Sequence, residues 1–163
     1  MNIKNLLEEL TLEEKLGLIC GADNWGNAGA ERLGIKRFTF VDGPQGVRKM
    51  TNKNIDEYET APATCFPTPS AMGCTWNTEL AEEVAEALGE ETAEHGRQAV
   101  NTPGINIKRI PICGRNFEYI SEDPVLSGEM GAAVIKGLQK KGISPTLKHY
   151  ALNNQESSRH FVS

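Results

Sequence analysis

The sequence alternates between short β-type runs and amphipathic helical segments, and this alternation constrains the fold more than any other feature. The order is strand, long connection, strand, helix, strand, loop, helix and strand. Strands that alternate with helices along a chain form parallel β/α units, whose helices cover a parallel sheet. The chain has 163 residues, which is enough for one domain with a sizeable core. We therefore expect an α/β fold.

Local patterns set the bounds of these elements. Thr11 and Glu14 have the spacing of a capping box, which predicts that a helix begins there. Gly96 and Gly142 follow the two long helical segments as stops, and the Gly- and Asn-rich stretch 22–34 predicts a loop. The expected strands are Ile35–Val41, Ala63–Phe66, Ala99–Thr102 and Ile143–Tyr150, and the expected helices are Leu6–Leu10, Leu12–Cys20, Asn77 or Thr78 to His95, and Ser127–Lys141.

Polar side chains follow the ends of the expected strands. Asp42 comes directly after the first strand, and Arg115 lies in the irregular segment after the third. Lys148 and His149 end the fourth, and a segment rich in Asn, Gln and Glu follows them. These residues could simply cap a turn and enter a solvated loop. Parallel strands bring their carboxyl ends to one face, where an α/β barrel places its site, and this shared location favours a functional site.

The charge balance bears on the class of partner. The net charge is −5, from 17 basic and 22 acidic residues. Nucleic acids and anionic membranes both select for a basic surface, so neither is expected as a partner. No stretch is apolar enough to span a bilayer, and acidic residues interrupt the N-terminal segment where a signal peptide needs an apolar core. We therefore expect a cytoplasmic protein.

The cysteines and histidines indicate no metal and no other cofactor. The four cysteines form no Cys-x-x-Cys pair, and no histidine lies at zinc-finger spacing from them. We expect all four to be reduced thiols that pack in the interior. No cluster of histidines and carboxylates has the spacing of metal ligands. Cys113 lies among polar groups and is the alternative candidate, a catalytic thiol.

Six segments of the chain match a known pattern in the same order. They are Val41-Asp42-Gly43-Pro44-Gln45-Gly46-Val47-Arg48, Phe66-Pro67 with Ala71-Met72-Gly73, 105–109, Gly114-Arg115-Asn116-Phe117-Glu118, Ser121-Glu122-Asp123-Pro124, and 148–156. Together they resemble glycoside hydrolase family 3, and more narrowly its β-glucosidase branch. The N-acetylglucosaminidase branch typically carries a Pro-Gly-His type of segment after Lys-His. Tyr150 and Ala151 follow here, which favours the glucosidase or xylosidase side.

The resemblance implies a fold and a set of site residues. The fold is a partial (β/α)8 TIM barrel, roughly its first half, and the ligand is a β-glucoside or oligosaccharide. Glu118 would orient a nearby Lys or Arg, and a non-proline cis peptide is expected around Lys148–His149. The residues that would hold the non-reducing sugar in the first subsite are Asp42, Arg48, Arg115, Lys148, His149 and Arg159.

The resemblance also implies catalytic groups that do not match any residue here. Retaining glycosidases need two carboxylates, a nucleophile and an acid/base. In the family the nucleophile is an aspartate on a later strand, usually in a Ser-Asp-Trp-like context, and the acid/base comes from an α/β-sandwich domain. A complete (β/α)8 barrel takes roughly 250 residues. We therefore expect residues 1–163 to be the N-terminal portion of the barrel domain of a larger β-glucosidase, inactive alone.

Three alternatives stay open at this point. The first is a β-xylosidase of the same family, which these subsite residues do not separate from a glucosidase. The second is a self-contained sugar-binding module without catalysis. The third is an unrelated α/β enzyme that uses Cys113 and His149 as a thiol–imidazole pair.

Overall fold

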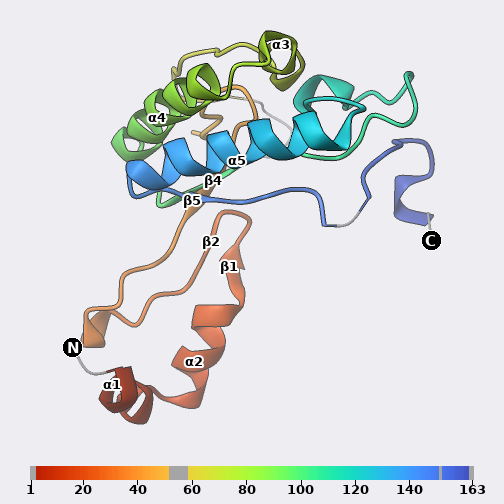
Figure 1. The fold of residues 1–163 in the computed structure, drawn as a ribbon. Helices are drawn as coiled ribbons and strands as arrows, with labels where there is room; N and C mark the ends of the chain where they lie inside the picture. The colour runs from red at the N-terminus through yellow and green to blue at the C-terminus, as the bar shows by residue number, and fades with distance from the viewer. Residues whose placement is uncertain (1–2, 52–58, 151, 162–163) are drawn as a thin grey trace. The chain divides into compact units, whose positions relative to one another are not determined.

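The computed structural model describes residues 3–51, 59–150 and 152–161. The chain divides into two compact units, Met1–Phe40 and Val41–Ser163. Figure 1 shows helices α1 and α2 with the β1–β2 hairpin in the first unit. The second unit holds α3, α4 and α5 with strands β4 and β5 (Figure 1).

The first unit begins with two short helices, α1 (Ile3–Glu9) and α2 (Leu12–Ile19). The predicted capping box is confirmed, because the Thr11 hydroxyl accepts from the Glu14 N–H at 3.2 Å and the Glu14 carboxylate accepts from the Thr11 N–H at 2.9 Å. The first helix starts at Ile3 and not at Leu6 as expected. Its start therefore lies about one turn earlier than the sequence pattern indicated.

The stretch 22–34, expected to be a loop, contains regular structure. Strands β1 (Gly21–Asp23) and β2 (Gly26–Asn27) form an antiparallel hairpin, and a 3₁₀ turn follows at Glu31–Leu33. The Asp23 carboxylate accepts from the Trp25 N–H at 2.7 Å and closes the hairpin turn. Glycine and asparagine therefore specify a tight turn here, which the composition alone did not separate from a loop.

The second unit is organised on a three-stranded sheet in the order β3–β4–β5. These strands are Phe40–Asp42, Ala99–Asn101 and Ser144–Pro145, and β4 and β5 run parallel. Each is shorter than the sequence pattern predicted. The parallel course of β4 and β5 continues as a single bridge between Gly104 and Lys148, where the Ile105 N–H donates to the Lys148 carbonyl at 2.9 Å.

The strand expected at Ala63–Phe66 is wrong, because this described segment is irregular. The Thr64 N–H donates to a Glu91 carboxylate oxygen at 2.8 Å, and the Phe66 N–H donates to the Gln45 carbonyl at 2.7 Å. Pro62 and Pro67 flank the segment and have no N–H to offer to a ladder. Side-chain and loop partners therefore replace a strand partner.

Helices α3, α4 and α5 lie in the described part of this unit, and two of them differ from expectation. Helix α4 (Thr78–Glu94) begins after the Asn77 cap, as predicted. Helix α5 runs over Pro124–Lys140, three residues ahead of the expected start, because Asp123 caps it and Pro124 takes the first turn. Helix α3 (Pro69–Thr75) was not expected, although Thr68 caps it and a proline takes its first turn, which is the pattern that begins α5.

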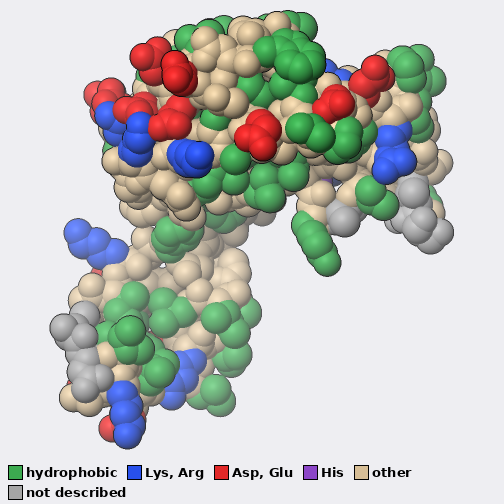
Figure 2. All heavy atoms as spheres, in the orientation of Figure 1, with side chains coloured by type: hydrophobic (Ala, Val, Ile, Leu, Met, Phe, Trp, Pro, Cys, Tyr) green, Lys and Arg blue, Asp and Glu red, His purple; other side chains and the backbone are tan. Residues whose placement is uncertain are grey.

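Helices α4 and α5 pack side by side (Figure 1). A side chain at Gly137 would bring its Cβ to 2.7 Å from the Ala85 Cβ, so glycine permits the close approach. Beside this contact Lys140, the last residue of α5, and Lys141, which follows it, pair with glutamates of α4. Figure 2 shows blue and red side chains gathered over that end of the helices. The interior of this layer is apolar and is formed by Val41, Val47, Ala85, Leu88, Val100, Leu138 and Ile143.

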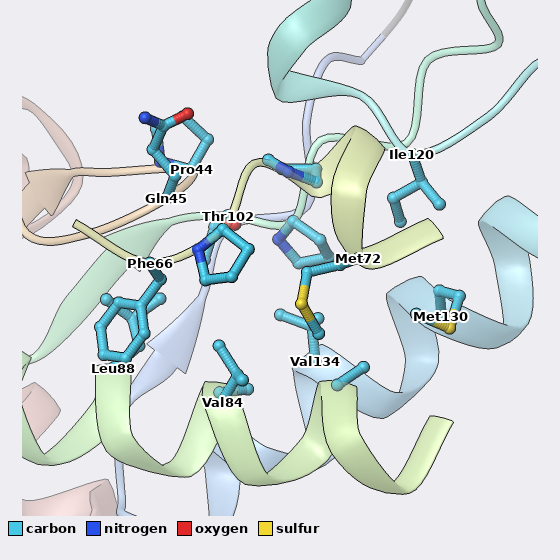
Figure 3. Close-up of a pocket in the computed structure, with 15 residues that line it drawn as sticks. Pro44, Gln45, Phe66, Met72, Val84, Leu88, Thr102, Ile120, Met130 and Val134 are labelled. Atoms are coloured by element: carbon cyan, nitrogen blue, oxygen red, sulfur yellow. The ribbon is translucent and has the colours of Figure 1, made fainter. Parts of the chain in front are cut away.

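A small apolar cavity of about 50 Å³ lies between α4, α5 and the proline-rich segment 66–69. Figure 3 shows Phe66, Met72, Val84 and Val134 around it. Neither its volume nor its lining suits a polar ligand the size of a sugar ring. It is therefore a packing void of the core, and the candidate site lies elsewhere.

The four cysteines are free thiols, but their expected burial is wrong for three of them. Cys20, Cys65 and Cys74 are exposed, and Cys113 is buried. Cys20 caps the end of α2 and Cys65 lies in the irregular segment described above, so neither faces the core.

In the described ranges, 3–51, 59–150 and 152–161, no helix is long and apolar enough to cross a membrane. The same ranges contain no group of three or more His, Cys, Asp or Glu side chains placed to hold a metal ion.

Candidate functional site

The candidate site is a hollow of about 620 Å³ in the second unit. It opens at the end of β3, whose last residue is Asp42, and beside the irregular segment that follows β4. Parallel α/β sheets present their sites at these carboxyl ends. The residues that line the hollow are Asp42, Gly43, Pro44, Gln45, Gly46, Arg48, Arg115, Phe117, Glu118 and Arg159.

A tight turn places the first two of these side chains. Gly43 and Gly46 adopt positive φ angles of 153° and 146°, a region that side chains with a Cβ rarely enter. The turn lets the Arg48 N–H donate to the Asp42 carbonyl at 2.8 Å. It also lets the Arg48 guanidinium donate to an Asp42 carboxylate oxygen. The sequence Asp-Gly-Pro-Gln-Gly-Val-Arg thus builds one side of the site from a single loop.

Glu118 joins the other charged groups. It follows Arg115 by one 3₁₀ turn, Asn116–Glu118, and its side chain is 3% exposed. One carboxylate oxygen accepts from the Arg115 guanidinium, and the other lies 2.8 Å from the Lys148 ammonium. That ammonium also lies 3.5 Å from an Asp42 oxygen. The five groups form a run of alternating charge in the order Arg48, Asp42, Lys148, Glu118 and Arg115.

This alternation keeps both carboxyl groups ionised. Burial alone would raise the pKa of Asp42, but the nearby Lys148 and Arg48 cations hold it below its ordinary value. Burial would likewise raise the pKa of Glu118, and the hydrogen bonds from Lys148 and Arg115 hold it below its ordinary value. The site therefore presents carboxylates, which only accept hydrogen bonds, next to cations, which only donate them.

His149 completes the cluster from the chain after β5. Its Nε2 lies 3.0 Å from an Arg115 guanidinium nitrogen, and its Nδ1 lies 2.8 Å from the Tyr119 hydroxyl. Burial and the adjacent Arg115 and Lys148 cations lower the pKa of His149 below its ordinary value. The Lys148–His149 peptide is cis, which confirms the expectation drawn from the resemblance.

Arg159 takes a different position from the other five candidates. It begins the 3₁₀ turn Arg159–Phe161 and lines the hollow with a side chain that is 43% exposed. Its guanidinium lies 3.4 Å from a Glu156 carboxylate oxygen. Four of the six predicted residues, Asp42, Arg48, Arg115 and Arg159, therefore line the hollow. Lys148 and His149 do not line it but contact residues that do.

Three neutral groups of this cluster were not predicted from the sequence. The Tyr119 hydroxyl contacts His149, Asn153 donates to that hydroxyl at 2.7 Å, and the Asn106 side chain accepts from the His149 N–H at 2.8 Å. Each of these residues lies within or beside a segment on which the family resemblance rests, so that resemblance could have identified it as part of the site. The two ring nitrogens of His149 contact Arg115 and Tyr119, which does not support a thiol–imidazole pair with Cys113.

The geometry fits a neutral, polyhydroxylated ligand better than a charged one. A hydroxyl both donates and accepts, so adjacent hydroxyls can pair with a carboxylate on one side and a cation on the other. The site offers this alternation, and each of its three cations already contacts a carboxylate.

The chain matches a known family over most of its length. Residues 29–161 match the model described as "Glycosyl hydrolase family 3 N terminal domain". The chain is 48% identical over 161 residues to "Thermostable beta-glucosidase B" of Acetivibrio thermocellus, which covers 98% of this chain and 21% of that protein. It is 44% identical over 156 residues to "Exo-alpha-(1->6)-L-arabinopyranosidase" of Bifidobacterium breve, with 94% and 21% covered.

Solved structures give the same result for the fold. β-Glucosidase 3B of Thermotoga neapolitana in complex with glucose is similar with a TM-score of 0.83 and 39% identity, over 94% of this chain and 24% of that one. The β-glucosidase of Kluyveromyces marxianus in complex with glucose gives 0.88 and 33%, over 96% and 18%. The expected class, a partial (β/α)8 barrel, is confirmed. The chain spans about a fifth of the length of the curated relatives it matches.

Proposed function

This chain belongs to glycoside hydrolase family 3, and we propose that the intact protein hydrolyses terminal, non-reducing β-D-glucosyl residues with retention of configuration. Residues 1–163 are then the N-terminal portion of its barrel domain and supply the first sugar subsite. The 48% identity to a protein named as a β-glucosidase and the likeness to glucose complexes support this reading.

The observation that carries the proposal is the run of alternating charges beside the hollow. Asp42 accepts from two adjacent sugar hydroxyls, while Lys148 and Arg115 donate to the oxygens of the same hydroxyls. A sugar whose hydroxyls point elsewhere leaves these buried groups unpaired, which costs binding energy. Glu118 keeps the two cations in place, since it contacts both and is almost fully buried.

The role of this subsite in the reaction is to hold the sugar ring while other groups attack it. Retention requires a carboxylate nucleophile and a carboxylic acid/base on either side of the scissile bond. We place both outside residues 1–163. Arg48 and Arg159 would close over the more open side of the ring, because both line the hollow and are about half exposed.

A pentopyranoside substrate is the second candidate. The relatives from Bifidobacterium breve and Bifidobacterium longum are named as α-L-arabinopyranosidases, at 44% and 43% identity. An α-L-arabinopyranoside lacks the hydroxymethyl group of a β-D-glucoside and differs in the orientation of one ring hydroxyl. A β-D-xylopyranoside lacks the hydroxymethyl group alone.

The first experiment is to purify the intact protein from its source and measure its mass and its activity. We expect a mass several-fold above 17.8 kDa and hydrolysis of 4-nitrophenyl β-D-glucopyranoside. The β-D-xylopyranoside and the α-L-arabinopyranoside are assayed in parallel, and the ratio of their kcat/KM values selects among the candidates. Glucose binding without hydrolysis of any of them would overturn the proposal in favour of a sugar-binding module.

A further inference from the structure

The hydroxyl of Tyr119 is a buried polar group beside the proposed subsite. The side chain is 1% exposed and directly follows the 3₁₀ turn that carries Glu118. Its hydroxyl oxygen lies 2.8 Å from Nδ1 of His149 and 2.7 Å from Nδ2 of Asn153. The phenol ring also meets the imidazole edge to face, with centroids 5.8 Å apart. Tyr119 therefore fixes both the plane of the imidazole and the contact at one of its nitrogens.

The other ring nitrogen determines where the imidazole carries its proton. Nε2 of His149 lies 3.0 Å from an Arg115 guanidinium nitrogen. A guanidinium only donates, so this contact requires a lone pair on Nε2. A neutral imidazole with a lone pair on Nε2 carries its hydrogen on Nδ1. That N–H points at the Tyr119 hydroxyl and donates to it.

The Tyr119 oxygen can accept this hydrogen bond together with the one from Asn153, because a phenol oxygen has two lone pairs. Burial raises the pKa of Tyr119, which keeps the hydroxyl neutral. The backbone of His149 is held as well, since its N–H donates to the Asn106 side chain at 2.8 Å. Every contact of the imidazole described here is thus consistent with one protonation state.

We propose that Tyr119 is a positioning residue that holds His149 in the Nδ1–H form, so that Nε2 accepts from the Arg115 guanidinium and fixes that guanidinium in the sugar subsite. This inference rests on the proposed function for the identity of the ligand. The Arg115 guanidinium lines the hollow and donates both to the Glu118 carboxylate and to Nε2 of His149. An imidazole with its hydrogen on Nε2 would turn a donor toward this guanidinium, so the Tyr119 hydroxyl acts on the sugar through His149 and Arg115.

The kinetic test compares Tyr119→Phe with a matched control in the intact protein. Tyr119→Phe keeps the ring and removes the hydroxyl, and we expect kcat/KM for the β-glucoside to fall roughly tenfold. Tyr150→Phe removes a hydroxyl from the neighbouring, fully exposed tyrosine and should leave kcat/KM unchanged. A fall in Tyr150→Phe equal to that in Tyr119→Phe would overturn the assignment.

A double-mutant cycle separates positioning from general structural support. If Tyr119 acts through His149, Tyr119→Phe has no further effect on kcat/KM once His149→Ala is present. The full effect of Tyr119→Phe in the His149→Ala background would show that the hydroxyl supports the fold or another group, and would overturn the proposal. Circular dichroism and melting of each variant establish that it is folded.

The protonation state is read directly by neutron diffraction on deuterated crystals of the intact protein. We expect deuterium on Nδ1 of His149 and none on Nε2 in the wild type. Deuterium on Nε2 alone would overturn this inference even if the protein hydrolyses β-glucosides. Conversely, deuterium on Nδ1 in a protein that hydrolyses no glycoside would support the tautomer and refute the proposed function.

Discussion

Two regions of the second unit contain the same kind of ion pair in different surroundings. Lys148 and Glu118 lie 2.8 Å apart at the candidate site, with side chains 10% and 3% exposed. Lys140 and Glu86 lie 2.7 Å apart on α5 and α4, with side chains 54% and 29% exposed. The distances are nearly equal, so the contact geometry does not distinguish the two pairs. They differ in how deeply their side chains are buried.

Because the ion pairs of the two regions differ in burial, they contribute differently to the structure. Exposed pairs are screened by water and salt and contribute little to stability. A buried charge loses its hydration and depends on its partners, so removing one partner is costly. The site thus uses burial to hold cations and carboxylates in fixed positions. The ion pairs beside α4 and α5 lie at the surface of an interface that apolar packing and the close approach at Gly137 already stabilise.

The largest effect is expected for Glu118→Gln. This change removes the negative charge that both Arg115 and Lys148 contact and leaves two partly buried cations facing each other. The free energy of unfolding of the intact protein should fall by about 3 kcal/mol. Chemical denaturation of the variant and the wild type measures it. A loss of stability no larger than that of Lys140→Met would contradict the comparison between the buried and the exposed ion pair.

A second large effect is expected for Lys148→Met, on activity. The substitution keeps an unbranched chain of similar length and removes the ammonium between Asp42 and Glu118. We expect kcat/KM for the β-glucoside to fall by about 100-fold, because a buried donor to the sugar is lost and two carboxylates are left facing each other. Steady-state kinetics checks this. Activity within threefold of the wild type would place Lys148 outside the subsite.

The pH dependence of stability separates the two regions more finely. The hydrogen bonds from Lys148 and Arg115 outweigh burial and lower the pKa of Glu118 below its ordinary value of 4.5. Glu118 therefore stabilises the fold fully above that pH, and this contribution is lost as the pH falls toward its folded-state pKa.

Denaturation of the wild type and Glu118→Gln at several pH values between about 5 and 3 tests this linkage. The wild type should lose more stability than the variant over that range. Glu86 has a lowered pKa as well, chiefly through its hydrogen bond to Lys140, but it lies on the helix surface. Its contribution should shrink when salt is added, whereas that of Glu118 should persist. If the stability of the wild type and that of Glu118→Gln changed with pH in the same way, the role assigned to Glu118 would be refuted.

The smallest effect is expected for Lys140→Met. The ammonium contacts Glu82 and Glu86, but the side chain is more than half exposed. The melting temperature should change by little more than the measurement error, and any change should vanish in high salt. The variant also serves as the charge-matched control for Lys148→Met, with activity equal to that of the wild type. A fall in melting temperature as large as that of Glu118→Gln would contradict the claim that the exposed ion pair contributes less than the buried one.

The sequence predicted which polar side chains lie together better than it predicted the bounds of the strands around them. Asp42, Arg115, Lys148 and His149 follow strand ends, and a parallel sheet brings such ends together, so their meeting could be foreseen. The strand expected at 63–66 was wrong because its N–H groups found partners in Glu91 and Gln45. Those partners lie far away in the sequence, and no local pattern reports them.

Helix caps and tight turns were determined by the sequence itself, because each depends on residues within a few positions of one another. The capping box of Thr11 and Glu14 and the Asn77 cap are examples. The tertiary structure alone decided which charges are buried and what lies between them. Glu118 connects Lys148 to Arg115, and Tyr119 meets His149, across about 30 residues of chain. Burial and hydrogen-bond partners depend on the packed sheet and loops, which bring distant segments to contact distance.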